Sequence, residues 1–146
     1  MEAKSSESCP FCRIARHEQT AEVLREDDEV MALLDLYPAT AGHVLVIPKQ
    51  HIEDIYSLPA DLGAKLMVAA LGIAGAIRRQ LSPDGLNLVQ ANGPAGGQTI
   101  PHFHLHVLPR YENDLVRLQF GHGDTPAPEA DLRRIASLIR SALDTQ

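Results

Sequence analysis

The sequence has no excess of positive charge. It contains 13 lysine and arginine residues against 19 aspartate and glutamate residues, which gives a formal net charge of −6 over 146 residues. General binding of nucleic acid or of an acidic membrane requires a basic face, so this balance argues against both kinds of partner. An anionic small molecule stays compatible with it, because such a ligand is bound by a few local donors.

Long hydrophobic runs and targeting segments are also missing. The longest nearly uncharged run, LMVAALGIAGAI, covers residues 66–77. It has the length of a buried helix, whereas a membrane-spanning helix needs about 20 apolar residues. No stretch resembles a signal peptide. We therefore expect a cytoplasmic protein without a membrane partner.

The chain lacks internal repeats and any linker long enough to divide it. Its length is that of one domain with a sizeable core. We expect a single domain over residues 1–146, in which residues 1–8 are disordered and residues 113–146 form a C-terminal extension with a helix.

Cysteine is scarce, and the two residues present form Cys9-Pro-Phe-Cys12. This C-x-x-C spacing occurs in redox motifs and in metal sites. A thioredoxin-like motif lies between a strand and a helix of a βαβ unit, whereas this pair follows only eight, mostly polar, residues. A metal site needs two more ligands, which the seven histidines of the chain could supply. The motif alone favours metal, with a redox pair or plain thiols as the alternatives.

The remaining pattern predicts an α+β fold. Short β-rich runs cover residues 21–27, 29–36, 43–48, 86–92 and 102–108. The main helix is expected over 57–81, where Leu66, Ala70, Ile73, Ile77 and Leu81 recur at helical spacing, and a terminal helix over 128–143. A turn or short helix is expected at 15–19. All but one of the links between strands are too short for parallel crossovers, which indicates an antiparallel sheet of about five strands.

Three histidines stand at positions 102, 104 and 106, with an apolar residue after each. In a strand, this period of two places the imidazoles on one face and the apolar residues on the other. An exposed edge strand, a metal site and a catalytic site would all give this spacing. The backbones of His102 and His106 would lie about 13 Å apart, too far for one ion to bind all three rings without severe bending. The three histidines are therefore expected to divide their roles.

A glycine-rich loop, NGPAGGQTI, directly precedes these histidines at residues 92–100. Consecutive glycines allow backbone amides to turn toward an anion, and Gln98 and Thr99 add side-chain donors. A simple hairpin turn would also use Gly96 and Gly97. Beside three histidines, the loop favours a phosphoryl group as ligand.

The sequence PHFHLHVLPR at 101–110 resembles the His-x-His-x-His-x-x motif of the histidine triad (HIT) superfamily, where x is apolar. LLDLYPATAGHVLVIPKQH at 33–51 resembles the segment of that family which holds an aspartate and then a glycine-histidine pair, and GGQTIPHFHLHVLPR at 96–110 resembles its phosphate loop and triad. With the cysteine pair, the resemblance covers about residues 9–112. No matching motif is found in residues 113–146.

The resemblance implies a HIT-like fold and a nucleotide hydrolase or nucleotidyltransferase that acts at the α-phosphate. His104 matches the nucleophile, which forms a nucleotidyl-histidine intermediate, and His106 matches the residue that contacts the phosphate and assists the leaving group. Asp35 would bind ribose hydroxyls, Leu34 and Leu36 would line the pocket of an adenine or another purine, and His43 lies near the site. The phosphate ligands would be Asn92, Gly97, Gln98, Thr99 and loop amides.

In zinc-bearing members of the family, two N-terminal cysteines, a later histidine and the first triad histidine bind one structural Zn²⁺. By resemblance, these ligands are Cys9, Cys12, His51 and His102, while His17 and His122 match nothing and are expected at the surface. The resemblance also implies a homodimer, for which the apolar helix at 59–81 is a candidate contact.

The cysteine pair is similar to bacterial and archaeal members, whereas GQT and LPR are similar to the fragile-histidine-triad branch of dinucleoside polyphosphate hydrolases. Leu33 departs from the aromatic residue that many members carry at this position. Dinucleoside polyphosphates and nucleoside phosphoramidates are therefore both expected substrates, and transfer to phosphate is also compatible. The alternatives are a non-catalytic nucleotide-binding module and a metal-dependent hydrolase that uses the histidine row as ligands.

Overall fold

The structure is a computed structural model that describes residues 6–118 and 125–143. The chain divides into two compact units, Met1–Val116 and Arg117–Gln146. Each is described by itself, and the expectation of a single domain over 1–146 stays a prediction. Residues 6–8 form an exposed turn, and the rest of the segment expected to be disordered lies outside the described residues, as does His122.

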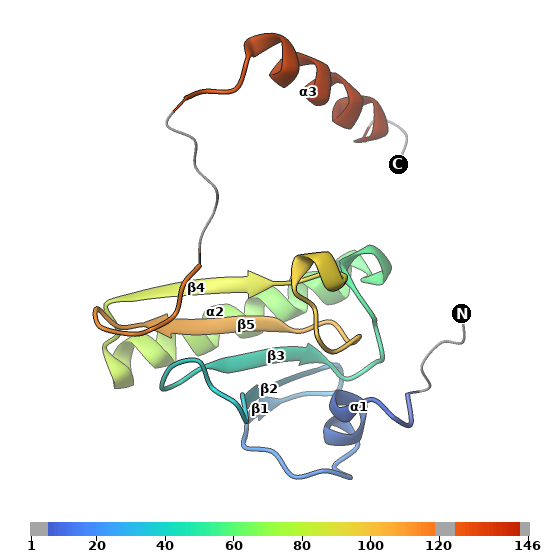
Figure 1. Cartoon of the computed structure of the whole chain (residues 1–146). Coiled ribbons are helices and arrows are strands. Elements are labelled where there is room, and N and C mark those ends of the chain that lie inside the picture. The colour runs from blue at the N-terminus through green and yellow to red at the C-terminus, as the bar shows by residue number, and fades with distance from the viewer. Residues whose placement is uncertain (1–5, 119–124, 144–146) are drawn as a thin grey trace. The chain divides into compact units, whose positions relative to one another are not determined.

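The first unit is built on an antiparallel sheet of five strands (Figure 1). The strands are β1 (Val23–Glu26), β2 (Val30–Leu34), β3 (Val44–Pro48), β4 (Gly85–Gln90) and β5 (Leu105–Arg110). Their order in the sheet is β1-β2-β3-β5-β4, so β5 is inserted between β3 and β4. This confirms the predicted α+β class and the antiparallel sheet.

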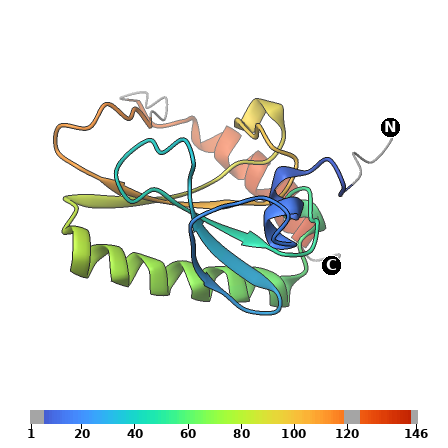
Figure 2. The same cartoon turned by 90° about the horizontal axis from the view of Figure 1, so that it is seen from below.

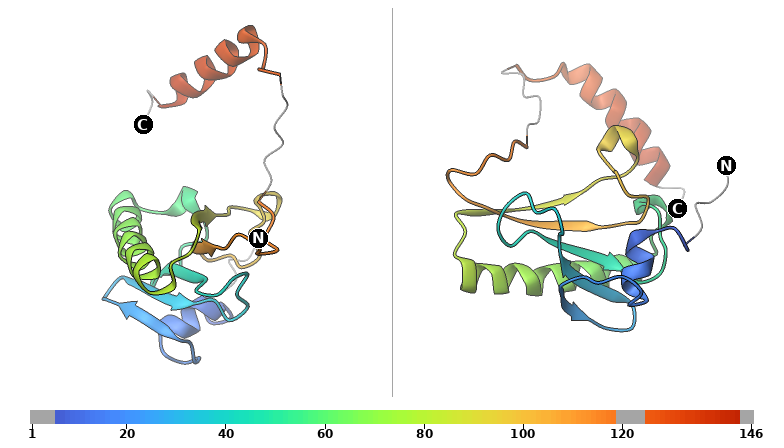
Figure 3. Two further views of the ribbon diagram at one scale, coloured as in Figure 1. Left: turned by 90° about the vertical axis from the view of Figure 1, so that its left-hand side faces the viewer. Right: turned by 60° about the horizontal axis from the view of Figure 1, so that its bottom comes forward.

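The helix α2 (Ala60–Leu81) lies along one face of the sheet (Figure 2), and Figure 3 shows the same arrangement from two other directions. It begins later than expected because Pro59 holds Leu58 in an extended conformation. A short 3₁₀ helix, η1 (Ile55–Ser57), occupies the expected first turn, and a second one, η2 (Pro94–Gly96), lies in the glycine-rich loop. By length and composition α2 resembles a membrane span, but Leu62, Leu66 and three further residues bury one side of it.

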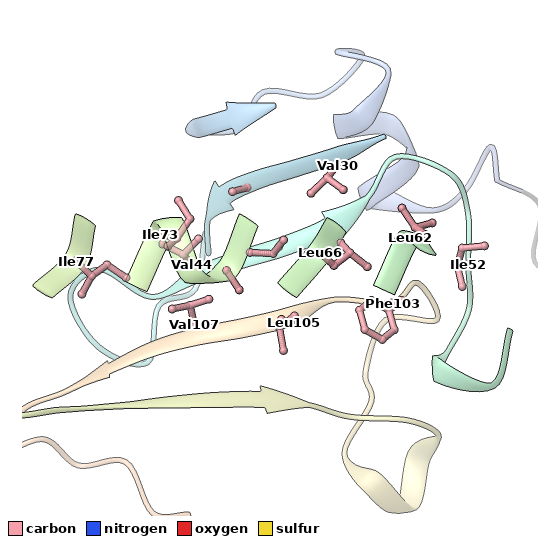
Figure 4. Close-up of a cluster of buried hydrophobic side chains, with 13 residues drawn as sticks. Val30, Val44, Ile52, Leu62, Leu66, Ile73, Ile77, Phe103, Leu105 and Val107 are labelled. Carbon is pink, nitrogen blue, oxygen red and sulfur yellow. The ribbon is translucent and has the colours of Figure 1, made fainter. Parts of the chain in front are cut away.

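The strands β2 and β3 alternate between two cores, as the period of two requires. Val30, Ala32, Val44 and Val46 face α2 and pack with Leu66, Ala70, Ile73, Ile77, Phe103, Leu105 and Val107 (Figure 4). The residues between them, Met31, Leu33, Leu45 and Ile47, pack with the N-terminal helix α1 (Pro10–Ala15) on the other side. The central strands are thus buried on both faces. Leu81, the last residue of the predicted apolar row, is 45% exposed at the end of α2.

The turn or short helix expected at 15–19 is a turn, and it follows the helix α1, which was not predicted. The helix α1 begins at Pro10 because Cys9 caps it and proline is favourable in its first turn. The predicted start of the last strand was wrong. The last strand begins at Leu105, so His102 and His104 precede it. Here the backbone N–H of Phe103 donates to Ile52 O at 2.6 Å, and the Pro48 carbonyl faces the His102 ring at 2.9 Å. The Phe103 N–H thus binds a loop and the Pro48 carbonyl binds a side chain, so neither joins the two strands. The ladder of hydrogen bonds between β3 and β5 therefore stops at Leu105.

The described part of the second unit contains the helix α3 (Glu129–Leu143). This agrees with the helix predicted at 128–143. Its apolar residues Leu132, Ile135 and Ile139 recur on one face but stay exposed, and Ala136 between them is half-buried.

Candidate functional site

Two cysteines and two histidines meet where α1 approaches the ends of β3 and β5. Their ligand atoms, the thiol sulfurs of Cys9 and Cys12 and one ring nitrogen each of His51 and His102, all lie within 4.8 Å of one another. Cys9 is the N-cap of α1, and its Sγ accepts a hydrogen bond from the backbone N–H of Cys12 at 3.5 Å. The short helix therefore directs both thiols to the same side. We call these four residues the metal cluster.

The spacing within the metal cluster fits a tetrahedral ion. His102 Nδ1 lies 3.3 Å from Cys9 Sγ and 3.5 Å from Cys12 Sγ, and His51 Nδ1 lies 3.3 Å from Cys12 Sγ. Bonds of about 2.0 Å to nitrogen and about 2.3 Å to sulfur give tetrahedron edges of roughly 3.3–3.8 Å. An ion can therefore enter with little movement of its ligands.

The hydrogen bond on the far side of His102 sets its tautomer. Its Nε2 lies 2.9 Å from the carbonyl oxygen of Pro48, which can only accept, so Nε2 carries the proton and Nδ1 keeps its lone pair. Burial lowers the pKa of His102 to about 4, so the ring is neutral at neutral pH. Burial and the neighbouring Cys9 raise the pKa of Cys12 to about 11, so a bound cation would displace a proton from this thiol.

Beside the metal cluster lies a cavity of about 510 Å³. Its apolar walls come from α1 and from β2, including Phe11, Ile14 and Leu33. Of the residues predicted for nucleotide binding and catalysis, six line it: Leu34, Asp35, Leu36, Thr99, His104 and His106. The cavity thus joins a mostly apolar part with a group of polar side chains, as small-molecule sites do.

His104 is buried at the wall of this cavity. Its Nδ1 lies 2.7 Å from the backbone carbonyl oxygen of His102. Because a carbonyl only accepts, Nδ1 carries the ring proton, and the lone pair is on Nε2. The remaining ring nitrogen is thus available to an electrophile in the cavity.

Hydrogen bonds also fix the tautomers of His43 and His106. The backbone N–H of Ala39 donates to His43 Nδ1 at 3.0 Å, so the proton of His43 is on Nε2. That Nε2 lies 2.8 Å from His106 Nδ1, which must accept, and the proton of His106 is therefore on its own Nε2. His106 consequently presents an N–H donor, not a lone pair, from its second ring nitrogen.

Burial keeps both of these rings neutral. It lowers the pKa of His43, although the Asp35 carboxylate, 3.6 Å from His43 Nε2, acts in the opposite direction. Burial, assisted by His104 and His43, lowers the pKa of His106 to about 4. The N–H of His106 is therefore a neutral hydrogen-bond donor at neutral pH.

Asp35, His43 and His106 also bring possible ligand atoms within 4.8 Å of one another. Their hydrogen bonds disfavour a metal there. A neutral histidine that binds a metal through Nε2 carries its proton on Nδ1, where it would point at the Ala39 N–H. We call Asp35, His43 and His106 the cavity group, and, in contrast to the metal cluster, this group is suited to hydrogen bonding.

Several donors of the glycine-rich loop are engaged in hydrogen bonds within the protein. The backbone amides of Gly96, Gly97 and Gln98 donate to Gly93 O or Pro94 O. The Gln98 side chain accepts from the Gly93 N–H at 2.8 Å and donates to Glu53 O at 2.7 Å.

The Asn92 side chain is likewise engaged, because its Oδ1 accepts from the Ile55 N–H at 2.8 Å. Of the predicted phosphate ligands, only Thr99 lines the cavity. Phosphate binding by Asn92, Gly97 and Gln98 stays a prediction.

Several cavity residues were not predicted from the sequence, among them Phe11, Ile14, Tyr37 and Ile100. The sequence did contain a signal for Phe11. This residue stands between Cys9 and Cys12, which share the metal cluster with His102, and His102 precedes His104 by only two residues. The all-antiparallel sheet, on the other hand, does not form the βαβ setting of a thioredoxin-like pair.

Comparison with known proteins identifies the family and the fold. The model of the HIT domain matches residues 16–113. A HIT family protein from Bacillus anthracis is 37% identical, with a TM-score of 0.88 over 94% of this chain and 99% of that chain. A Zn-bound histidine triad family protein from Mycobacterium smegmatis is 33% identical, with a TM-score of 0.73 over 97% and 100%.

Among curated proteins, adenylylsulfatase HINT3 of Arabidopsis thaliana is 39% identical over 74% of this chain and 55% of its own length. The HIT model covers the sheet, α2 and all three triad histidines, and the HIT-like fold is confirmed. The chain therefore belongs to the HIT family.

Proposed function

We propose that this protein is a nucleotide hydrolase or nucleotidyltransferase that acts at the α-phosphate through His104. The observation that supports this most directly is the tautomer of His104, whose Nδ1–H is bound by a carbonyl while Nε2 is available in the cavity. HIT proteins are typically nucleotide hydrolases, and one relative is named an adenylylsulfatase.

In the proposed first step, the Nε2 lone pair of His104 attacks the α-phosphorus. A P–N bond forms, and the bond between phosphorus and the leaving group breaks with its electron pair on the leaving group. The Nε2–H of His106 stabilises that developing charge by a hydrogen bond. In the second step, water or another acceptor attacks the nucleotidyl-histidine, the P–N bond breaks, and the proton of the attacking group is released to solvent.

The cavity supplies binding groups for the rest of the substrate. Asp35 is proposed to bind ribose hydroxyls, with Leu34, Leu36 and the apolar walls around a purine base, adenine among them. The Thr99 hydroxyl would donate to a phosphoryl oxygen. Asn92, Gly97 and Gln98 would then act through the loop that they hold, since their hydrogen bonds fix the segment that carries Thr99.

The metal cluster is proposed to bind one structural Zn²⁺ through Cys9, Cys12, His51 and His102. The donor set is of the closed Cys₂His₂ kind, and the spacing of its atoms supports tetrahedral binding. The zinc-bound relative from Mycobacterium smegmatis is a further support. When bound, this ion supplies structural cross-linking between α1 and the two segments around His51 and His102.

We also propose a cytoplasmic homodimer. The outward side of α2 exposes Met67, Val68 and Leu71, and β4 exposes Leu86 and Leu88 at the edge of the sheet. Apolar side chains beside an unpaired strand edge favour self-association. Sedimentation should find twice the chain mass at micromolar concentration, and a monomer there would count against this assembly. The net charge of −6 disfavours nucleic acid as a partner.

The catalytic proposal is tested by replacing the nucleophile. His104→Ala should bind nucleotide and lose turnover by several orders of magnitude, because the covalent route is removed. Substrates to compare are diadenosine polyphosphates, adenosine phosphoramidate and adenylyl sulfate. Mass spectrometry of quenched wild-type protein should find one nucleotidyl adduct on His104. His17→Ala is the matched control, since His17 is exposed and contacts Glu26.

A non-catalytic nucleotide-binding module would bind these compounds without turnover and without an adduct. A His104→Ala protein with near-normal turnover would instead exclude His104 as the nucleophile.

A further inference from the structure

Phe11 is the residue that joins the two parts of the site. It stands between the metal-cluster residues Cys9 and Cys12 and is only 5% exposed. Its ring centroid lies 5.6 Å from that of His102, at an interplanar angle of 73°, and 5.2 Å from that of His104, at 53°. Phe11 also lines the cavity. A single side chain therefore contacts a metal ligand, the proposed nucleophile and the space for the substrate.

The position of Phe11 is determined from both sides. The flanking thiols converge on His102 Nδ1 at 3.3 and 3.5 Å, so the first turn of α1 cannot rotate without separating them from that ring. On the sheet side, Met31, Leu33, Leu45 and Ile47 belong to the same buried cluster as Phe11. The ring is thus held between the sheet and the two histidines.

The ring of His104 is held by a hydrogen bond and by contacts with two other rings. The hydrogen bond between its Nδ1 and His102 O sets the tautomer and fixes one edge of the ring. The two ring contacts bear on its orientation. Phe11 lies at 5.2 Å, and His106 lies at 4.9 Å with an interplanar angle of 68°. Tilted and edge-to-face pairs of this kind have preferred orientations.

The geometry points to Phe11 as a positioning residue that links the metal cluster to the nucleophile. It holds the His104 ring at the angle that directs Nε2 into the cavity. The metal cluster, in turn, holds Phe11. This inference rests on the proposed role of His104 and adds a reason why the cluster adjoins the catalytic histidines without entering the chemistry.

The test compares two phenylalanines of equal burial. Phe103 is also 5% exposed, but it packs in the core beneath α2 and belongs to the cluster on the opposite side of the sheet from Phe11. Phe11→Leu and Phe103→Leu make the same chemical change. Both should lower the melting temperature, and both should retain one zinc per chain.

Phe11→Leu alone should lower the single-turnover rate of adduct formation, by about tenfold or more, because a displaced reacting group loses near-attack geometry. Its kcat should fall more than its KM rises.

Nitrogen-15 NMR of the His104 ring supplies a readout that does not depend on turnover. Wild type and Phe103→Leu should show one Nδ1–H tautomer with sharp signals, and Phe11→Leu should show broadened signals or a mixture of tautomers. Equal adduct rates and equal His104 spectra in the two variants would overturn the inference. If wild type forms no adduct, the proposed function fails, while the spectra still decide whether Phe11 positions His104.

Discussion

The metal cluster and the cavity group use the same side chain in opposite ways. In the metal cluster, His102 faces a backbone carbonyl, that of Pro48, with its Nε2. In the cavity group, His43 faces a backbone amide, that of Ala39, with its Nδ1. The carbonyl leaves His102 with a lone pair directed at the thiols, and the amide leaves His43 with a proton directed at His106. In both groups, one backbone group sets the tautomer of the histidine, according to whether it donates or accepts a hydrogen bond.

His104 lies between these two groups and is linked to both. It binds the carbonyl of His102 through Nδ1, and its ring contacts His106. The first triad histidine therefore orients the second, while the third prepares a donor for the same cavity. The division of roles among the three histidines stays a prediction, which these different surroundings support.

Among the tests that separate the two groups, removal of one thiol should have the largest effect, on zinc content and on the free energy of unfolding. In Cys12→Ser, the cluster loses a ligand that contributes to the proposed zinc site, and metal binding and folding are coupled. We expect zinc to fall from about one per chain to near zero, and the free energy of unfolding to fall by several kcal/mol. Metal analysis and denaturant unfolding measure the two quantities.

His43→Leu is the matched control, because it removes a histidine from the cavity group. It should keep its zinc. A folded, active Cys12→Ser protein with wild-type stability and no metal would contradict a structural role for the ion.

The fold was accessible from the sequence because its signals are periodic. The alternation in β2 and β3 appears directly as two cores, and the spacing of Leu66, Ala70, Ile73 and Ile77 marks the buried side of α2. The boundaries that failed depend on single contacts. The start of β5 is set by bonds to Ile52 and by the Pro48 carbonyl, and no pattern within residues 102–108 encodes these.

The residues that meet at the candidate site were also accessible, but their protonation was not. Residue type and resemblance brought together Cys9, Cys12, His51 and His102, and the structure places all four in one cluster. Which ring nitrogen carries a proton depends on the backbone group that faces it, and this is a product of tertiary structure. The hydrogen bonds from the Ile55 N–H to the Asn92 side chain and from the Gly93 N–H to the Gln98 side chain could not be predicted for the same reason.

The second test breaks the tautomer chain of the cavity group. His43→Leu removes the donor to His106 Nδ1, so His106 can place its proton on either nitrogen. We expect kcat to fall by about 10- to 100-fold, which is no more than the lower end of the loss for removal of a general acid or base, because His106 itself is retained. His43→Gln retains an N–H donor of similar reach and should recover part of that loss. Equal activity of both variants and wild type would show that the hydrogen bond from His43 does not orient His106.

The smallest expected effect is on stability in acid. There, the contribution of the cavity group can be separated from that of the metal cluster by comparing the free energies of unfolding of wild type and a variant. Burial lowers the pKa of His106 to about 4, while an unfolded histidine has a pKa of about 6.5. As pH falls from about 6.5 to about 4, the unfolded chain takes up a proton that the folded chain refuses, so stability present at neutral pH is progressively lost.

Because His106 is only partly buried, its share should be less than about 1 kcal/mol per pH unit. The zinc proposed for the metal cluster would also be released in acid as its ligands protonate, but this contribution would be common to wild type and His106→Gln. The difference between their free energies of unfolding, measured with denaturant from pH 7 to pH 4.5, therefore isolates the cavity group. It should change in favour of His106→Gln as pH falls. A difference that stays constant over this range would mean that His106 titrates alike in the folded and unfolded states. That result would contradict the assignment of a neutral N–H donor to His106.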